Sequence, residues 1–394
     1  MQSEHSPARI HVVQSGQSLY DIAQAHGVSS DKISSTNQLS TPAQLVVGQA
    51  LVIPPAHASQ IATVSQGGIE VNAYIEPRES VTSSEKSAVR DASPYLTYLA
   101  PFSFRIKRDG TLDIPPLDNL PEIAHRNHTI SMMVVTNLEK DQFSAELGSM
   151  ILHDENLSNR LIDNILSTAS KLNFRDIHFD IEHIKPEDRD AYNLFLRKAA
   201  KRIKGAGLML STALAPKTSA AQKGAWYTSH DYRTHGEIAD FVVIMTYEWG
   251  YSAGPPMPVS PINSVRKVLE YAITEIPPSK IVMGQNLYGY DWTLPYKPGG
   301  SYARALSPQQ AIDLARARNV PIQYDTTAQA PHFTYQDDAG KKHEVWFEDA
   351  RSIQAKFDLL RELKLRGISY WKLGLAFPQN WTLLQYNFPI MKRE

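Results

Sequence analysis

The clearest alternation of hydrophobic and polar positions lies between residues 174 and 184, which read FRDIHFDIEHI. Successive side chains of a β-strand point to opposite faces, so one face of this segment is apolar and the other is ionisable. The apolar face carries Ile177, Phe179 and Ile181. The ionisable face carries Asp176, His178, Asp180 and Glu182. The segment is therefore predicted to be a strand with a titratable face.

From residue 69 to the end of the chain, apolar strand-like runs alternate with amphipathic helix-like stretches such as NLSNRLIDNILSTASKL and SVRKVLEYAITEI. Eight such runs favour an α/β fold of the closed (β/α)8 TIM-barrel type over an open sheet. Residues 299–350 are too long for a simple crossover and predict a small α+β insertion between strands seven and eight, beside the barrel mouth. The predicted strands cover residues 71–75, 95–102, 129–135, 176–182, 208–213, 241–247, 281–288 and 368–373.

Residues 10–54 form a separate short pattern of strand, helix, helix and strand. Ser18 can cap the first helix and Gly27 can end it, and GQALVIP returns as the last strand. The run GQSLYDIAQAHGV, with NQL and LVVGQALVIP after it, resembles the LysM carbohydrate-binding module. The alternative is a purely structural unit. Residues 55–68 are rich in Ala, Ser, Gln and Gly and are predicted to be a linker.

The LysM resemblance implies a shallow groove for N-acetylglucosamine-containing glycan between two facing loops. One loop would consist of Gly16, Gln17, Ser18 and Leu19, and the other of Thr41, Pro42 and Ala43.

Composition narrows the possible partners. The formal net charge is −1, with 40 Lys and Arg against 41 Asp and Glu, so no basic field favours nucleic acid or an anionic membrane. Cysteine is absent, which excludes disulfides, thiolate metal sites and cysteine nucleophiles. The opening MQSEHSPARIHVVQSG lacks a secretory signal pattern, and no apolar run of about 20 residues could span a bilayer. A soluble monomer is expected.

The row of ionisable residues suggests chemistry, because a carboxylate enclosed by a barrel is costly unless it is hydrogen-bonded or charge-coupled. A structural polar network is the alternative. A metal shared by His178 and Glu182 is disfavoured, since four residues span roughly 13 Å of strand and metal bonds are about 2.1 Å long. Asp180 and Glu182 can instead act as an acid–base pair in which repulsion raises one pKa. No metal and no cofactor is expected.

The run DIHFDIE, followed downstream by MTYEWGY, LYGYDW and ISYWKLG, resembles the family-18 glycoside hydrolases over residues 69–394. It is most similar to the LysM-bearing N-acetylglucosaminidases that degrade the cortex peptidoglycan of germinating spores. The resemblance implies that Glu182 is the general acid/base and that Asp180 orients the substrate's acetamido group. It also implies that Tyr247 bonds the acetyl oxygen and that Trp371 forms the floor beneath the reacting sugar.

Two residues differ from the chitinase pattern: His178 occupies the position of an aspartate, and Glu248 replaces the aspartate after the strand-six tyrosine. One hypothesis is that a protonated His178 attracts Asp180 away from Glu182. The alternative is that His178 hydrogen-bonds within the barrel core. Further substrate contacts are predicted from polar and aromatic residues near strand ends, namely His178, Glu248, Trp249, Asn286, Tyr290, Asp291 and Trp292.

The resulting prediction is a retaining, substrate-assisted hydrolase of N-acetylglucosaminyl bonds in spore-cortex or cell-wall peptidoglycan, located in the spore or at the cell wall. A chitinase is the closest alternative. A non-catalytic glycan-binding coat protein is another, although the presence of both Asp180 and Glu182 argues against it.

Overall fold

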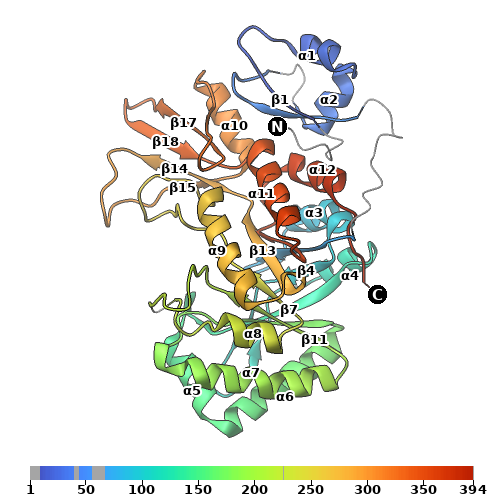
Figure 1. Ribbon diagram of the computed structural model, residues 1–394, viewed down its shortest axis with the longest axis vertical. Helices are drawn as coiled ribbons and strands as arrows, with labels where there is room; N and C mark the ends of the chain where they lie inside the picture. The colour runs from blue at the N-terminus through green and yellow to red at the C-terminus, as the bar shows by residue number, and fades with distance from the viewer. Residues whose placement is uncertain (1–8, 40–43, 56–66, 225, 394) are drawn as a thin grey trace.

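The computed structural model describes residues 9–39, 44–55, 67–224 and 226–393. Eight parallel strands form its central barrel (Figure 1). Each strand pairs with the next along the chain, and the last pairs with the first to close the barrel. The predicted (β/α)8 barrel is confirmed. The strands are β3 (Glu70–Ile75), β4 (Tyr98–Pro101), β7 (Ile130–Thr136), β10 (Asp176–Asp180), β11 (Met209–Leu214), β12 (Phe241–Ile244), β13 (Ile281–Asn286) and β19 (Gly367–Trp371).

Helices cover the outside of the barrel, and several of them begin at a side-chain cap. The Asp154 side chain accepts a hydrogen bond from the backbone of Leu157 at the start of α6, and Asn173 ends that helix in the left-handed conformation. The helices are α3 (Ser83–Ala92), α4 (Leu120–His125), α5 (Ala145–His153), α6 (Glu155–Leu172), α7 (Arg189–Gly205), α8 (Tyr232–Ile238), α9 (Ile262–Glu275), α11 (Ala350–Glu362) and α12 (Pro378–Asn387). Short strands β5 (Phe104–Ile106), β6 (Leu112–Asp113), β8 (Leu138–Glu139) and β9 (Gln142–Phe143) lie in the loops.

The alternation in β10 separates two environments. Phe179 packs edge-on against Phe195 of α7 in the layer between strands and helices. His178 points the other way, into the barrel, where its ring lies 5.9 Å from that of Tyr74. The titratable face of β10 is therefore the interior face of the barrel. The strand ends at Asp180, so Glu182 lies just beyond it rather than within the predicted strand 176–182.

The insertion after β13 is a five-stranded antiparallel sheet with one helix. Its first strand begins at Gly289, so the unit begins earlier than the predicted residue 299. The reason is that residues 290–293 pair with residues 343–346. Its elements are β14 (Gly289–Thr293), β15 (Arg304–Leu306), α10 (Pro308–Ala317), β16 (Gln323–Asp325), β17 (Ala330–Gln336) and β18 (Lys342–Trp346).

The N-terminal module has the predicted strand–helix–helix–strand order: β1 (Arg9–Val12), α1 (Leu19–His26), α2 (Ser30–Thr36) and β2 (Ala50–Ile53). It lies beside α10 and α12 (Figure 1). Gln379 of α12 donates hydrogen bonds to the Asn37 side chain (2.6 Å) and the Ala50 carbonyl (3.0 Å), and Ile322 of the insertion donates to the Val47 carbonyl (2.9 Å). Most of the predicted linker lies outside the described residues. Within the described ranges, no helix is long and apolar enough to cross a membrane.

Candidate active site

A cavity of about 840 Å³ opens at the carboxyl end of the barrel strands. A (β/α)8 barrel brings the loops that follow its different strands together at this end, which is where the active sites of such barrels are found. Two buried carboxyl groups, Asp180 and Glu182, lie on its wall. Most of the remaining wall is aromatic, contributed by Tyr74, Phe102, Phe143, Trp226, Tyr227, Tyr247, Tyr251, Tyr288, Tyr290 and Trp371.

Glu182 lies just beyond the end of β10 and is held there by hydrogen bonds. Its backbone N–H donates to the Asn137 side chain (3.0 Å), and Asn137 donates back to the Glu182 carbonyl (2.9 Å). The Trp226 indole N–H donates to Glu182 Oε2 at 2.5 Å. This indole stacks on His183, with the ring centroids 6.1 Å apart and the planes 6° from parallel. The carboxyl group is thus fixed while it still faces the cavity.

Asp180 and Glu182 form an electrostatically coupled pair. Burial raises the pKa of both carboxyl groups. The negative charge of Asp180 raises the pKa of Glu182 further, and the indole of Trp226 partly opposes this increase. Oδ1 of Asp180 has no hydrogen-bond partner among the described residues. At neutral pH the pair therefore retains a proton, and Glu182 is the member that holds it more strongly.

Aromatic side chains shape the floor of the cavity. Trp371, at the end of β19, packs edge-on against Phe102 (4.9 Å between centroids) and Tyr74 (5.4 Å). Tyr247 follows β12 and lines the same cavity. Burial raises the pKa of its phenol far above neutrality, so Tyr247 is a neutral hydrogen-bond donor there. Flat apolar rings with a few polar atoms form a surface suited to a sugar.

Glu248 is the third carboxyl group in the cavity. Its Oε1 accepts hydrogen bonds from the hydroxyls of Tyr288 and Tyr290, the latter at 3.1 Å. Burial raises its pKa while these two hydroxyls lower it. The backbone at Glu248 is left-handed, with φ 67°, which turns the chain after Tyr247. Glu248 and Tyr290, both predicted to contact substrate, line the cavity.

His178 does not reach the cavity. It is completely buried and is hydrogen-bonded through both ring nitrogens, to Ser211 (2.7 Å) and Tyr74 (2.9 Å). Burial lowers its pKa to about 3, so the ring is neutral at physiological pH. The hypothesis of a protonated His178 that attracts Asp180 is therefore wrong. The prediction that His178 contacts substrate is also wrong, because Tyr74 separates the ring from the cavity.

Four other predicted contacts lie away from the cavity wall. Trp249 packs against the main hydrophobic core. The Asn286 carboxamide is fully buried between Ser260 and the Tyr288 carbonyl. Asp291 faces the opposite side of β14, where Tyr335 (2.8 Å) and His343 (2.8 Å) bind it. The Trp292 indole N–H donates to the Gly254 carbonyl inside the fold. Proximity to a strand end therefore does not by itself bring a side chain to the cavity wall. Asp291 and Trp292 belong to the insertion sheet, and Asn286 is enclosed by its own hydrogen-bond partners.

Several wall residues were not predicted from the sequence. Trp226 and Tyr227 come from the loop after β11, and His183 directly follows Glu182. The local sequence pattern gives no signal for Trp226, which lies well beyond the end of β11. Lys372 also lines the cavity, and its ammonium group is paired with Glu76 beyond the end of β3.

In the N-terminal module, the predicted glycan loop is tied to its own helix. Gln17 Oε1 accepts a hydrogen bond from the Gln14 backbone (2.9 Å), and Ser18 caps α1 through Asp21. Gly16 has φ 80° and is exposed. Leu19 packs partly against the module's core. The facing loop of Thr41, Pro42 and Ala43 lies outside the described residues.

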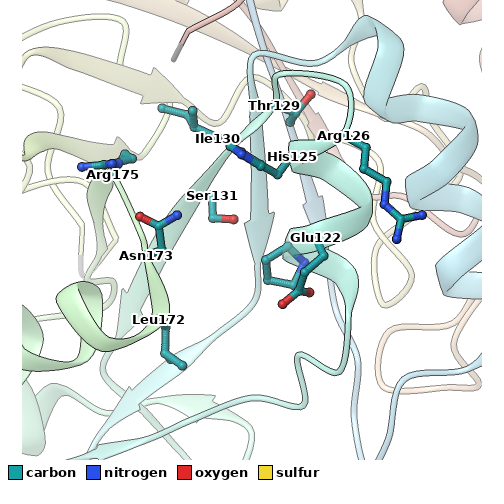
Figure 2. A pocket seen from close by; sticks show the side chains of 10 residues that line it. Glu122, His125, Arg126, Thr129, Ile130, Ser131, Leu172, Asn173 and Arg175 are labelled. Carbon is teal, nitrogen blue, oxygen red and sulfur yellow. The ribbon is translucent and has the colours of Figure 1, made fainter.

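A second cavity, of about 370 Å³, lies near the opposite, amino end of β7 and β10. Figure 2 shows that its two arginines, Arg126 and Arg175, point away from one another. No buried carboxyl group lines it, in contrast to the cavity at the other end. Across the described residues, no cluster of three His, Asp or Glu side chains could hold a metal ion.

Comparisons with known proteins identify the family of each part of the chain. The family model described as glycosyl hydrolases family 18 matches residues 73–376, and the LysM domain model matches residues 11–54. The chain therefore belongs to glycosyl hydrolase family 18, and it is a glycosidase that carries an N-terminal LysM domain.

Particular relatives are close over the whole chain. The chain is 53% identical over 427 aligned positions to the cortical fragment-lytic enzyme of Bacillus subtilis, covering 98% of this chain and 99% of the relative. The crystal structure of the spore cortex-lytic enzyme SleL of Bacillus megaterium matches with a TM-score of 0.94 at 48% identity, covering 99% of this chain and all of the other. SleL of Bacillus cereus matches with a TM-score of 0.93 at 47% identity, covering 98% and 99%.

Proposed function

We propose that this chain hydrolyses N-acetylglucosaminyl β-1,4 bonds of spore-cortex peptidoglycan, with Glu182 as the general acid/base. The similarity to enzymes named as cortical fragment-lytic over nearly the whole chain supports the substrate class. The observation that supports the residue assignment is the buried Asp180–Glu182 pair, in which the charge of one carboxyl group keeps the other protonated inside an aromatic cavity.

In the proposed reaction, protonated Glu182 gives its proton to the glycosidic oxygen as the bond to the anomeric carbon breaks. The oxygen of the substrate's own acetamido group attacks that carbon, which forms a bicyclic oxazolinium ion. Glu182, now a carboxylate, removes a proton from water, and the water oxygen opens the ring on the face that the leaving group occupied. The product therefore retains its configuration.

An enzyme nucleophile fits this site less well. Retaining enzymes with such a nucleophile place two carboxyl groups about 5–5.5 Å apart on opposite sides of the bond. Asp180 and Glu182 are two residues apart at the end of one strand and approach from one side. We assign Asp180 and Tyr247 to the acetamido group instead, as the partners that align its oxygen and balance its developing charge. Trp371 would form the apolar floor beneath the same sugar.

The LysM domain would hold the enzyme on its polymer through the loop at residues 16–19. Its hydrogen bonds to the insertion and to α12 would keep this binding face in a constant position relative to the cavity. We place the protein in the spore or at the cell wall on the names of its relatives, and a monomer remains our expectation.

A direct test compares the wild-type chain with Glu182→Gln on purified cortex fragments and on chitin. Wild type should generate new reducing ends on cortex fragments in excess of those on chitin, and the variant should generate almost none while it still binds the fragments. Proton NMR of the first product should show the β-anomer. Faster release from chitin would replace the substrate assignment with a chitinase, and an α-anomer would contradict the mechanism.

A further inference from the structure

Four buried side chains form a continuous hydrogen-bonded chain beneath the cavity. Ser211 Oγ donates to Asp176 Oδ2 (2.6 Å), and Ser211 Oγ also lies 2.7 Å from His178 Nδ1. His178 Nε2 in turn lies 2.9 Å from the Tyr74 hydroxyl. Asp176, His178 and Ser211 have no exposed surface, whereas Tyr74 lines the cavity. These hydrogen bonds therefore connect a fully buried carboxyl group inside the barrel with the floor of the active site.

The donor and the acceptor of each of these hydrogen bonds can be assigned by elimination. When Asp176 is ionised it only accepts, so the Ser211 hydrogen points to it. The Ser211 oxygen then accepts from His178 Nδ1–H, which leaves Nε2 of the neutral ring without a hydrogen. Nε2 must accept, so Tyr74 donates to it. In this state the Tyr74 oxygen presents only lone pairs to the cavity.

Protonation of Asp176 reverses every bond. Asp176 then donates to Ser211, Ser211 donates to Nδ1 of His178, and Nε2–H of His178 donates to the Tyr74 oxygen. The hydrogen of Tyr74 is then free to point into the cavity. Each intermediate group passes on one hydrogen and receives another, so one proton moves from the cavity to Asp176 and no other group changes its charge.

The surroundings leave Asp176 able to change its protonation state. Its Oδ1 has no hydrogen-bond partner among the residues the structure describes. Burial raises the pKa of Asp176 to about 7, and the carboxylates of Asp240 and Glu70 add to the effect while Arg366 opposes it. Tyr98 also approaches but donates to Glu70. At the upper end, Tyr74 faces the charges of Asp180 and Glu182.

We propose that Asp176, Ser211 and His178 form a proton relay that sets the direction of the Tyr74 hydroxyl, and are thereby positioning residues for the Asp180–Glu182 pair. The kinetic part of this inference rests on the proposed hydrolase function. Tyr74 as a donor would stabilise the Asp180 carboxylate, whereas Tyr74 as an acceptor would destabilise it. The protonation state of Asp176 would therefore influence the Asp180–Glu182 pair without direct contact.

Nitrogen-15 NMR of histidine-labelled full-length protein tests the relay without any need for turnover. The His178 signals are identified by their loss in His178→Asn or, should that variant not fold, in His178→Gln. We expect the hydrogen on Nδ1 at high pH and on Nε2 at low pH, with the change near neutrality, and Ser211→Ala should abolish the change. A single tautomer from about pH 5 to about pH 9 would overturn the relay.

Kinetics then test its consequence, with a matched control on the same strand. Thr212, the neighbour of Ser211, makes the same kind of buried bond, from Oγ1 to His235 Nδ1 at 3.0 Å, but on the other face. Ser211→Ala should lower kcat about tenfold with little change in KM and should shift the pH profile. Thr212→Val should lower thermal stability comparably and leave the profile unchanged.

A double variant separates the relay from simple destabilisation. In the Tyr74→Phe background the relay has no end in the cavity, so adding Ser211→Ala should cause no further loss of kcat. An equal loss in both backgrounds, or identical pH profiles for Ser211→Ala and Thr212→Val, would refute the coupling. If the wild type cleaves no N-acetylglucosaminyl polymer, the proposed function fails, and the NMR measurement still decides the relay.

Discussion

Asp176 and Asp180 lie at opposite ends of β10, on the same face, and both are buried. Burial raises the pKa of each to about 7. Their surroundings nevertheless differ. Asp176 is enclosed by the barrel interior and bonds Ser211, whereas Asp180 opens on the cavity beside Glu182. One strand thus carries an enclosed half and a reactive half, and depth along the barrel axis distinguishes them.

The largest expected effect comes from removing the acid in the reactive half. Glu182→Gln keeps the shape of the side chain but cannot deliver a proton, so kcat should fall by about 10³-fold or more. Glycan binding should persist, as measured by co-sedimentation with cortex fragments. Asp176→Asn is the matched carboxyl-to-amide control, and a fall in kcat as large as that of Glu182→Gln would remove the distinction between the halves.

The second effect concerns the partner carboxyl group. Asp180→Asn should lower kcat by about 10²-fold, because the acetamido group loses a charged partner in a buried site. The variant also lacks the negative charge that raises the pKa of Glu182. Glu182 should then lose its proton at lower pH, which moves the alkaline limb of the kcat/KM profile downward. An alkaline limb that stays in place would show that Asp180 does not hold the proton on Glu182.

In the enclosed half, Asp176 is expected to affect stability as well as the relay. The folded-state pKa of Asp176 is raised from 3.8 to about 7, so the folded protein binds more protons than the unfolded chain between these values. The stability that the folded protein gains from this bound proton is fully present below pH 3.8 and is lost as the pH rises to about 7. Asp176→Asn should remove a slope of up to about 1.4 kcal/mol per pH unit from the free energy of unfolding in that window.

Urea denaturation of wild type and Asp176→Asn at several pH values measures this difference. Asp180 and Glu182 contribute slopes of the same sign, so the informative quantity is the difference between the two proteins. If the free energy of unfolding depends on pH in the same way in both proteins, Asp176 is already neutral, or already ionised, throughout the window.

The smallest expected effect concerns the hydrogen bond between Trp226 and Glu182 in the reactive half. Trp226→Phe keeps a ring beside His183 but removes the indole hydrogen that bonds Glu182 at 2.5 Å. Because this bond favours the carboxylate, its loss should raise the pKa of Glu182 and move the alkaline limb upward, with kcat changed only a few-fold. Trp249→Phe is the control and should leave the profile unchanged, because Trp249 is half-buried against the main core and does not line the cavity.

Much of this architecture could be predicted from local pattern. The eight apolar runs predicted the barrel, and the capping residues and apolar stripe of the N-terminal segment predicted a small independent module. Asp180, Glu182, Tyr247 and Trp371 all lie on the cavity wall, because each is near the carboxyl end of a strand and parallel strands bring these ends together. Asn286, Asp291 and Trp292 are also near strand ends, but they are buried among other segments, and no periodicity records what packs over a strand.

The sequence by itself determined which face of each strand is polar and where the chain turns, because side-chain alternation, helix capping and chain direction are local properties. Only the tertiary structure decided which members of the row at residues 176–182 can react. Trp226 reaches Glu182 across 44 residues, and Tyr74 reaches His178 across 104. Burial and hydrogen-bond partners set the protonation of each group, and both depend on contacts between distant segments that exist only after the barrel has closed.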